Sequence, residues 1–189
     1  MPLAMAPTDP RSDERLVAAA DAGDAHAFET LYLRHRSWAA DLAWRFLRDR
    51  DAARDVMQEA FLQLLGRFPG FRLTSRLRTF LYPVVKHIAI DRLRKAQRNV
   101  GADDTAVEEL PAPVPADGEP WRDIERAVET LPAGQREVLL MRFVDDLALQ
   151  EIAVALDVPL GTVKSRLHNA LEALRGDPNL RELFEAPGG

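Results

Sequence analysis

The stretch Leu156–Leu167, which reads LDVPLGTVKSRL, decides the fold of the C-terminal half of the chain. Asp157 stands where a tight turn needs a left-handed backbone, and Asp tolerates that conformation better than bulky residues do. Pro159 precedes a helix whose early turns carry hydroxyls and cations, the groups that bind base edges and phosphates in a DNA major groove. These residues are Thr162, Lys164, Ser165, Arg166 and His168. The stretch therefore predicts a helix-turn-helix.

Apolar residues around this stretch fall where a helix-turn-helix buries its small core. They are Ile152, Ala153, Leu156, Val158, Val163 and Leu167. Residues 133–143 and 147–156 have helical character and are expected to pack against the second helix. Taken alone, the pattern also fits a compact three-helix domain that binds no DNA.

The N-terminal half shows helical periodicity without any alternating strand pattern. Apolar residues recur at three- and four-residue steps between Phe28 and Phe46, which predicts one helix there. Further helices are expected over residues 51–65 and 75–97, with a loop between them that begins at Gly66. Pro83 lies in the first turns of the last helix, where its missing N–H predicts a bend.

An acidic, Pro-rich segment at residues 99–120 separates the two halves. It holds six acidic residues and no basic one, and its four prolines stop a helix from propagating. The preceding stretch, residues 72–98, has eight basic residues and one acid, a net charge of +7. We therefore predict an all-α chain of two small helical domains joined by a flexible acidic linker. The parts are a disordered N-terminus (1–12), a domain (13–98), the linker (99–120), a domain (121–176) and a short tail (177–189).

Composition argues against several other classes of protein. The chain has no Cys, which excludes disulfides and thiolate metal sites. Its four His residues are far apart in the sequence, so we expect no metal site, no cofactor and no catalytic residues. No apolar run approaches the roughly 20 residues that span a bilayer, and no signal peptide is visible. We expect a cytoplasmic protein with no membrane contact of its own.

Several motifs, in order along the chain, resemble the conserved regions of RNA polymerase sigma factors. The stretch DAARDVMQEAFL at residues 51–62 resembles region 2.2. Leu81-Tyr82 and Ala89–Lys95 look like regions 2.3 and 2.4. Similarity to region 4 lies in Leu131-Pro132, Gln135–Val138, Glu151–Ala153 and Gly161–Arg166. Region 3 is absent, and this two-domain layout resembles the extracytoplasmic-function (ECF) group of the sigma-70 family.

This resemblance implies that the chain binds core RNA polymerase and promoter DNA and directs promoter-specific initiation. It also implies an anti-sigma factor as a partner. By position, one face of the helix at 51–65 would dock onto a coiled coil in the largest polymerase subunit. The expected contacts are Asp55, Gln58, Glu59, Phe61 and Leu62, with Phe61 suited equally to the core. By composition alone, the same face would be read as merely solvated.

The basic stretch has the composition of a single-stranded DNA site. Cations track phosphates, while aromatic residues such as Phe71, Phe80 and Tyr82 receive unstacked bases. The resemblance implies that the loop at 66–75 captures a flipped base of the −10 element and that the next helix holds the melted strand. The expected contacts are Arg72, Arg76, Arg78, Lys86, His87, Arg92, Arg94 and Lys95. The family commonly has Asn where this chain has His87, which leaves the −10 preference open.

The helix-turn-helix is expected to read the −35 element. Lys164 and Arg166 are its main candidates for base or phosphate contacts, and Arg136 and Arg142 are expected to hold phosphates. Two alternatives remain open. One is a helix-turn-helix regulator that acts without polymerase, and the other is a sigma-like protein that only sequesters an anti-sigma factor. The acidic linker is either a solubilising spacer or a segment that follows the path to the RNA exit channel and screens the basic helix.

Overall fold

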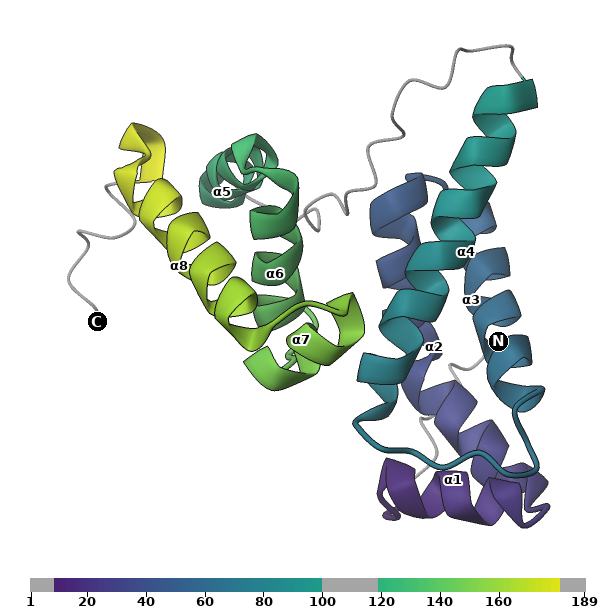
Figure 1. Cartoon of the computed structure of the whole chain (residues 1–189). Coiled ribbons are helices and arrows are strands. Elements are labelled where there is room, and N and C mark those ends of the chain that lie inside the picture. Colours follow the sequence, from purple (N-terminus) through teal and green to yellow (C-terminus); the bar gives the residue numbers. More distant parts are fainter. Residues whose placement is uncertain (1–8, 100–118, 181–189) are drawn as a thin grey trace. The chain divides into compact units, whose positions relative to one another are not determined.

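The computed structural model describes residues 9–99 and 119–180, and these residues form two compact helical units (Figure 1). The described residues contain helices and no strand, which confirms the predicted all-α fold of two helical domains. Most of the predicted acidic linker, and most of the two predicted terminal segments, lie outside the described residues. Within the described part of the chain, no helix is both long and apolar enough to cross a membrane.

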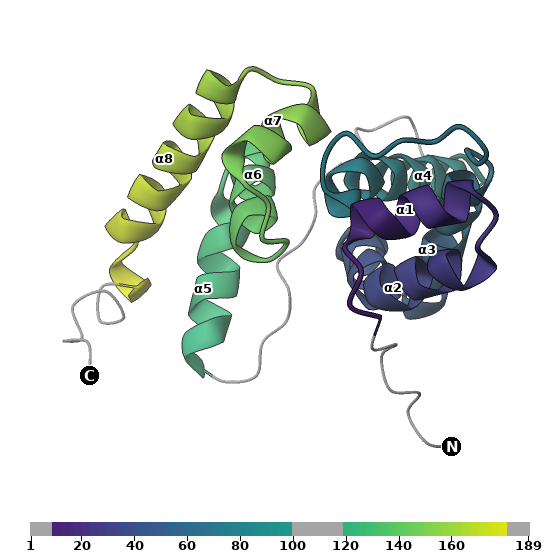
Figure 2. The same ribbon diagram turned by 90° about the horizontal axis from the view of Figure 1, so that it is seen from below.

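The N-terminal unit is a three-helix bundle with a short helix across one end. Its elements are α1 (Asp13–Asp21), α2 (Ala25–Leu47), α3 (Arg50–Leu65) and α4 (Leu77–Asn99). Side chains just before three of these helices accept hydrogen bonds from their first N–H groups, as N-caps do. They are Ser12, Asp24 and Asp49. In Figures 1 and 2, α1 runs across the end of the bundle where the loop between α3 and α4 passes.

The bundle is held by apolar side chains that face one another from α2, α3 and α4. Leu31, Leu42, Val56, Leu64 and Leu81 are completely buried. The predicted helices at 28–46 and 51–65 correspond to α2 and α3, whereas α4 begins and ends two residues later than expected. Helix α4 continues through Pro83.

A polar cluster, which the sequence did not reveal, fixes α1 on α2. The carboxylate of Asp13 accepts a hydrogen bond from Nη1 of Arg34 at 2.6 Å, and its other oxygen lies 2.7 Å from Nε2 of His35. His35 is buried. Arg34 also donates to the carbonyls of Asp9 and Arg11, at 3.0 and 3.1 Å. The ordered N-terminal unit therefore starts at least at Asp9, before the predicted boundary at residue 13.

Burial by itself raises the pKa of Asp13, but the hydrogen bonds and positive charge of His35 and Arg34 outweigh it. The pKa of this carboxyl therefore lies below its usual value. A neighbouring carboxyl behaves in the same way, since hydrogen bonds from Arg11 lower the pKa of Asp9 to about 2.

The C-terminal unit consists of α5 (Glu119–Thr130), α6 (Ala133–Phe143), α7 (Leu149–Leu156), α8 (Leu160–Gly176) and the 3-10 turn η1 (Pro178–Leu180). The expected helix at 133–143 is confirmed, and the one at 147–156 begins two residues later. Helix α5 starts within the segment predicted to be linker. Pro120 does not prevent this, because a Pro in the first turn of a helix lacks only an N–H that has no helical partner.

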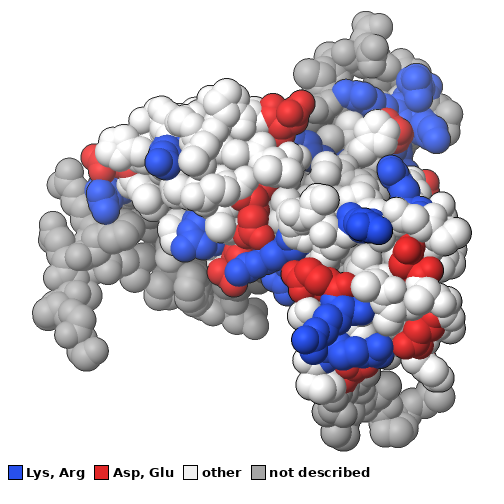
Figure 3. Space-filling model, turned by 60° about the horizontal axis from the view of Figure 1, so that its bottom comes forward, with Lys and Arg blue, Asp and Glu red and all other residues white. Residues whose placement is uncertain are grey.

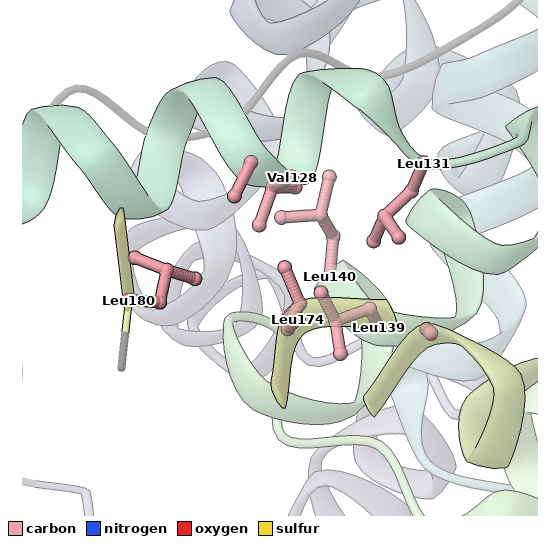
Figure 4. Close-up of a cluster of buried hydrophobic side chains, with 8 residues drawn as sticks. Val128, Leu131, Leu139, Leu140, Leu174 and Leu180 are labelled. Carbon is pink, nitrogen blue, oxygen red and sulfur yellow. The ribbon is translucent and has the colours of Figure 1, made fainter. Parts of the chain in front are cut away.

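One hydrophobic cluster joins α5, α6, α8 and η1 (Figure 4). Its buried members are Ala127, Val128, Leu131, Leu139, Leu140, Ala170, Leu174 and Leu180. Leu180 comes from the predicted C-terminal tail, yet only 1% of it is exposed. The folded unit therefore extends at least to residue 180, because burial of this leucine completes the core.

Leu180→Ala is expected to lower the free energy of unfolding of the C-terminal unit by about 2–5 kcal/mol, since it removes a fully buried side chain. Val154→Ala is the control, because Val154 is 68% exposed and its truncation should change stability by less than about 0.5 kcal/mol. Urea unfolding of the full chain, followed by circular dichroism, measures both. Equal stability of the two variants would show that Leu180 is not part of the core.

Asp13→Asn is expected to destabilise the N-terminal unit by about 1–3 kcal/mol at pH 7. The pKa of Asp13 is lower in the folded than in the unfolded chain. The carboxylate therefore stabilises the fold above about pH 4, and this contribution is lost as the pH falls through the folded-state pKa. Urea unfolding of both proteins from pH 7 to about pH 3 should show the difference shrinking on the acid side. Asp41→Asn, at an exposed position on α2, provides the control. A difference that is independent of pH would contradict this role of Asp13.

Candidate nucleic-acid and protein interfaces

The turn between α7 and α8 has the backbone that its sequence predicts. Asp157 adopts φ 52° and ψ 49°, which confirms the left-handed conformation expected there. The N–H of Val158 donates to the carbonyl of Ala153 at 3.1 Å and closes the end of α7. At the other end of α7, a Glu151 carboxylate oxygen accepts a hydrogen bond from the N–H of Ala148 at 2.8 Å.

The interior of the helix-turn-helix is smaller than the sequence suggested. Ile152 and Val163 are completely buried. The other four predicted core residues, Ala153, Leu156, Val158 and Leu167, are only partly buried. The turn is nevertheless packed from both sides, because Met141 of α6 and Leu147 are also completely buried.

The first turns of α8 present the predicted DNA-contacting side chains. Lys164, Ser165 and His168 are exposed, while Thr162 and Arg166 are half-buried. Arg166 packs against the first turn of α6 at Gly134. A Cβ placed on Gly134 would lie 3.0 Å from both Cζ and Nε of Arg166. Sequence reasoning missed this contact, because nothing in the local pattern links residues 134 and 166.

The two arginines of α6 lie in different surroundings. Arg136 is buried, and its guanidinium donates to the backbone carbonyls of Glu129 and Leu131. This burial argues against the predicted phosphate contact, since the side chain is used to fasten the end of α5 to α6. Arg142 remains half-exposed and donates to the carbonyl of Leu147 at 3.4 Å. Arg142 is therefore the better placed of the two for a phosphate.

The predicted docking face of α3 is partly acidic and partly apolar. Asp55, Gln58 and Leu62 are exposed, and Glu59 is half-buried. Leu62 is 66% exposed, and Leu65, which sequence reasoning left out, is 47% exposed. Phe61 instead faces the interior, where it is 3% exposed and its ring centroid lies 5.1 Å from that of Tyr32. The structure therefore favours the core alternative for Phe61.

Arg92 of α4 connects the predicted polymerase-docking face of α3 with the predicted −10 contacts of α4. Its Nη1 lies 3.3 Å from Oδ2 of Asp55, and its Nη2 lies 3.2 Å from Oε2 of Glu59. One predicted DNA contact thus pairs with two predicted polymerase contacts. On the face drawn in Figure 3, some Lys and Arg side chains lie next to Asp and Glu side chains, and others lie among uncharged residues.

The remaining predicted −10 contacts lie on α4 and on the loop that precedes it. Arg72, Arg76, Arg94 and Lys95 are exposed, and Arg78 and Lys86 are half-buried. The guanidinium of Arg78 lies over the Trp38 ring, 5.4 Å from its centroid. His87 is 76% exposed, with Nε2 3.3 Å from Oδ2 of Asp91.

Aromatic residues line the inner side of this loop. The ring centroids of Phe28 and Phe68 are 6.1 Å apart, those of Phe68 and Phe71 are 5.6 Å apart, and those of Phe71 and Phe80 are 4.9 Å apart. Tyr82 is completely buried, which argues against the predicted role of its ring in receiving a base. Among the described residues, no group of three or more His, Asp or Glu side chains is arranged to hold a metal ion.

Known proteins match both units. Residues 31–99 match the family described as Sigma-70 region 2, and residues 121–174 match Sigma-70, region 4. The ECF RNA polymerase sigma factor SigW of Bacillus subtilis is 31% identical over 175 residues, which cover 85% of this chain and 92% of SigW.

Two solved structures share the fold. CnrH, in a complex with the cytosolic domain of CnrY, has a TM-score of 0.63 and 22% identity over 94% of this chain and 100% of its own. The sigma factor RpoE from Bartonella quintana has a TM-score of 0.61 and 22% identity over 85% of this chain and 98% of its own.

Two helical units, one of them a helix-turn-helix whose second helix carries basic side chains, are typical of a DNA-binding transcription protein. The chain belongs to the sigma-70 family of RNA polymerase subunits and, within it, to the ECF group. As a member of this family, it binds core RNA polymerase and directs initiation at promoters.

Gly134→Ala is expected to weaken binding to the −35 element by about 5-fold, because the new Cβ displaces the Arg166 guanidinium from its place on α6. Stability should not fall, because Ala favours a helix over Gly by about 1 kcal/mol. Fluorescence anisotropy with a duplex −35 probe, together with a thermal melt, separates the two effects. Gly176→Ala is the matched control, since an added Cβ there meets no neighbour. Unchanged DNA affinity of Gly134→Ala would show that Gly134 does not position Arg166.

Proposed function

We propose that the two units divide the work of promoter recognition, in a cytoplasmic protein that itself catalyses no reaction. The N-terminal unit docks onto core polymerase through α3 and holds the melted −10 strand with α4 and its preceding loop. The C-terminal unit places the start of α8 in the major groove of the −35 element. The observation that carries this proposal is the exposed basic and hydroxyl surface of α8, directly after a turn with helix-turn-helix geometry.

The α3 surface supports the docking part of the proposal. Leu62 and Leu65 leave apolar area open next to the polar side chains of Asp55 and Gln58. Exposed apolar side chains beside charged ones are typical of a surface that another protein covers. Arg92 pairs with Asp55 and Glu59, and we propose that it orders these carboxylates for docking.

The loop and α4 support the single-stranded DNA part. Arg72 and Arg76 on the loop side, and Arg94 and Lys95 further along α4, are exposed where phosphates can reach them. Because Tyr82 is buried, we assign the base contacts to the loop before α4. Phe71 of this loop is half-buried and packs against Phe68. Cations beside an aromatic platform are the usual components of a single-strand site.

We also propose that an anti-sigma factor controls the chain. The related RpoE from Bartonella quintana was solved in a complex with the anti-sigma factor NepR. The exposed apolar side chains of α3 offer such a partner the same surface that we assign to polymerase, so the two would compete.

Arg166→Ala is expected to lower transcription from the chain's own promoter by about 10-fold, the effect of losing one base contact worth about 1–3 kcal/mol. Binding to core polymerase should not change, because Arg166 lies on α8 and the proposed docking surface lies on α3. Sequencing transcripts after overexpression identifies the promoter. Run-off transcription and a core-polymerase affinity assay then measure the two effects.

Arg175→Ala is the matched control, since Arg175 is exposed in the last turn of the same helix, where it pairs with Glu172 at 2.7 Å. It should transcribe like the wild type. Equal losses of transcription and core binding in Arg166→Ala would refute the assignment of Arg166. DNA binding without any effect on the start site chosen by core polymerase would instead favour a regulator that acts alone.

A further inference from the structure

A single carboxylate of α1 holds the loop that precedes α4. Oδ1 of Asp21 accepts hydrogen bonds from the N–H groups of Gly70, at 2.6 Å, and Phe71, at 3.0 Å. These two donors are adjacent in the sequence but lie 49 and 50 residues away from Asp21. Gly70 has φ +103°, a conformation suited to glycine. The bend at Gly70 directs both N–H groups toward one acceptor.

Helix α1 is a firm support for this carboxylate. Leu16 and Val17 are buried under it, and Asp13 at its first turn is bound to Arg34 and His35 of α2. Asp21 is the last residue of the same helix. One end of α1 is therefore fixed to the bundle, and its other end holds the loop, which passes beside it in Figures 1 and 2.

The contacts of the loop leave one of its sides available to a ligand. Its inner side is the aromatic row of Phe68 and Phe71, which continues to Phe28 and Phe80. Its backbone near the tip is held by Asp21. Arg67, Arg72 and Thr74 are exposed. These exposed side chains are therefore on a loop whose backbone is held by Asp21 and by the aromatic contacts.

We propose that Asp21 is the positioning residue for base selection at the −10 element, acting through the loop at residues 66–76. This inference rests on the proposed single-strand site. A loop that is already in its binding conformation loses little entropy when a base enters, and it rejects a base of the wrong shape more strongly. Without the carboxylate, the N–H groups of Gly70 and Phe71 lose their shared acceptor and the loop samples other conformations.

The expected effects distinguish positioning from simple charge. A negative charge near DNA is unfavourable. If Asp21 acted only through its charge, Asp21→Ala and Asp21→Asn would therefore both bind DNA more tightly than the wild type, and by the same amount. Positioning predicts that Asp21→Ala binds its −10 strand less selectively, while Asp21→Asn, which keeps an acceptor oxygen, behaves like the wild type.

The experiment uses holoenzyme assembled from the full chain and core polymerase. Fluorescence anisotropy measures binding to a labelled single strand with the −10 sequence of the chain's own promoter, and to the same strand scrambled. The ratio of the two affinities should fall about 10-fold in Asp21→Ala and stay within about 2-fold of wild type in Asp21→Asn. Asp41→Ala, which removes an exposed acid from α2, is the matched control and should leave the ratio unchanged.

Hydrogen exchange of the free chain gives a second measurement that needs no DNA. The Gly70 and Phe71 amides should exchange faster in Asp21→Ala, with the amides of α2 and α3 unaffected. An unchanged affinity ratio, or equal exchange of the two amides in both proteins, would overturn the role of Asp21 alone. If wild-type holoenzyme does not prefer the −10 strand over the scrambled one, that result would contradict the proposed single-strand site and, with it, this role of Asp21.

Discussion

Burial of one apolar face on each helix is the constraint on which both units depend. In the N-terminal unit, leucines and valines from three helices are completely buried, and in the C-terminal unit one cluster joins four elements. In proteins, most of the stability of a helix comes from packing of its apolar face rather than from its own hydrogen bonds. The charged and hydroxyl groups of α3, α4 and α8 are therefore held in place by apolar contacts on the opposite faces of the same helices.

Polar links add to these apolar contacts at three places. Asp13 fixes α1 to α2, Asp21 fixes the loop to α1, and Arg136 fastens α5 to α6. Each link joins a charged side chain to backbone groups or to a partner from another element. Bonds of this kind are shorter and stronger than those between neutral groups. They set the geometry of the surfaces rather than supplying the bulk of the stability.

The sequence predicted the elements with strong periodicity and the turn at Asp157, because these depend on local pattern and backbone preference. It did not reveal which charged side chains are buried and bonded within a folded unit and so are not available to DNA or polymerase. Arg136 and Arg166 look alike in the sequence, yet only the structure shows that one is buried and the other borders Gly134. Helix α1 and Leu180 were missed for the same reason, since their stabilising partners lie far away along the chain.

The pairing of Arg92 with Asp55 and Glu59 has a consequence for ionic strength. Protein–DNA affinity falls with added salt in proportion to the number of phosphates that are neutralised, since each one releases counterions. A guanidinium shared by two carboxylates brings no net positive charge to a phosphate. On the proposed assignment of the basic stretch to DNA, Arg92 would add little to the salt dependence of promoter binding. We therefore expect promoter affinity in concentrated electrolyte to decline more gently than the eight basic residues of the stretch imply.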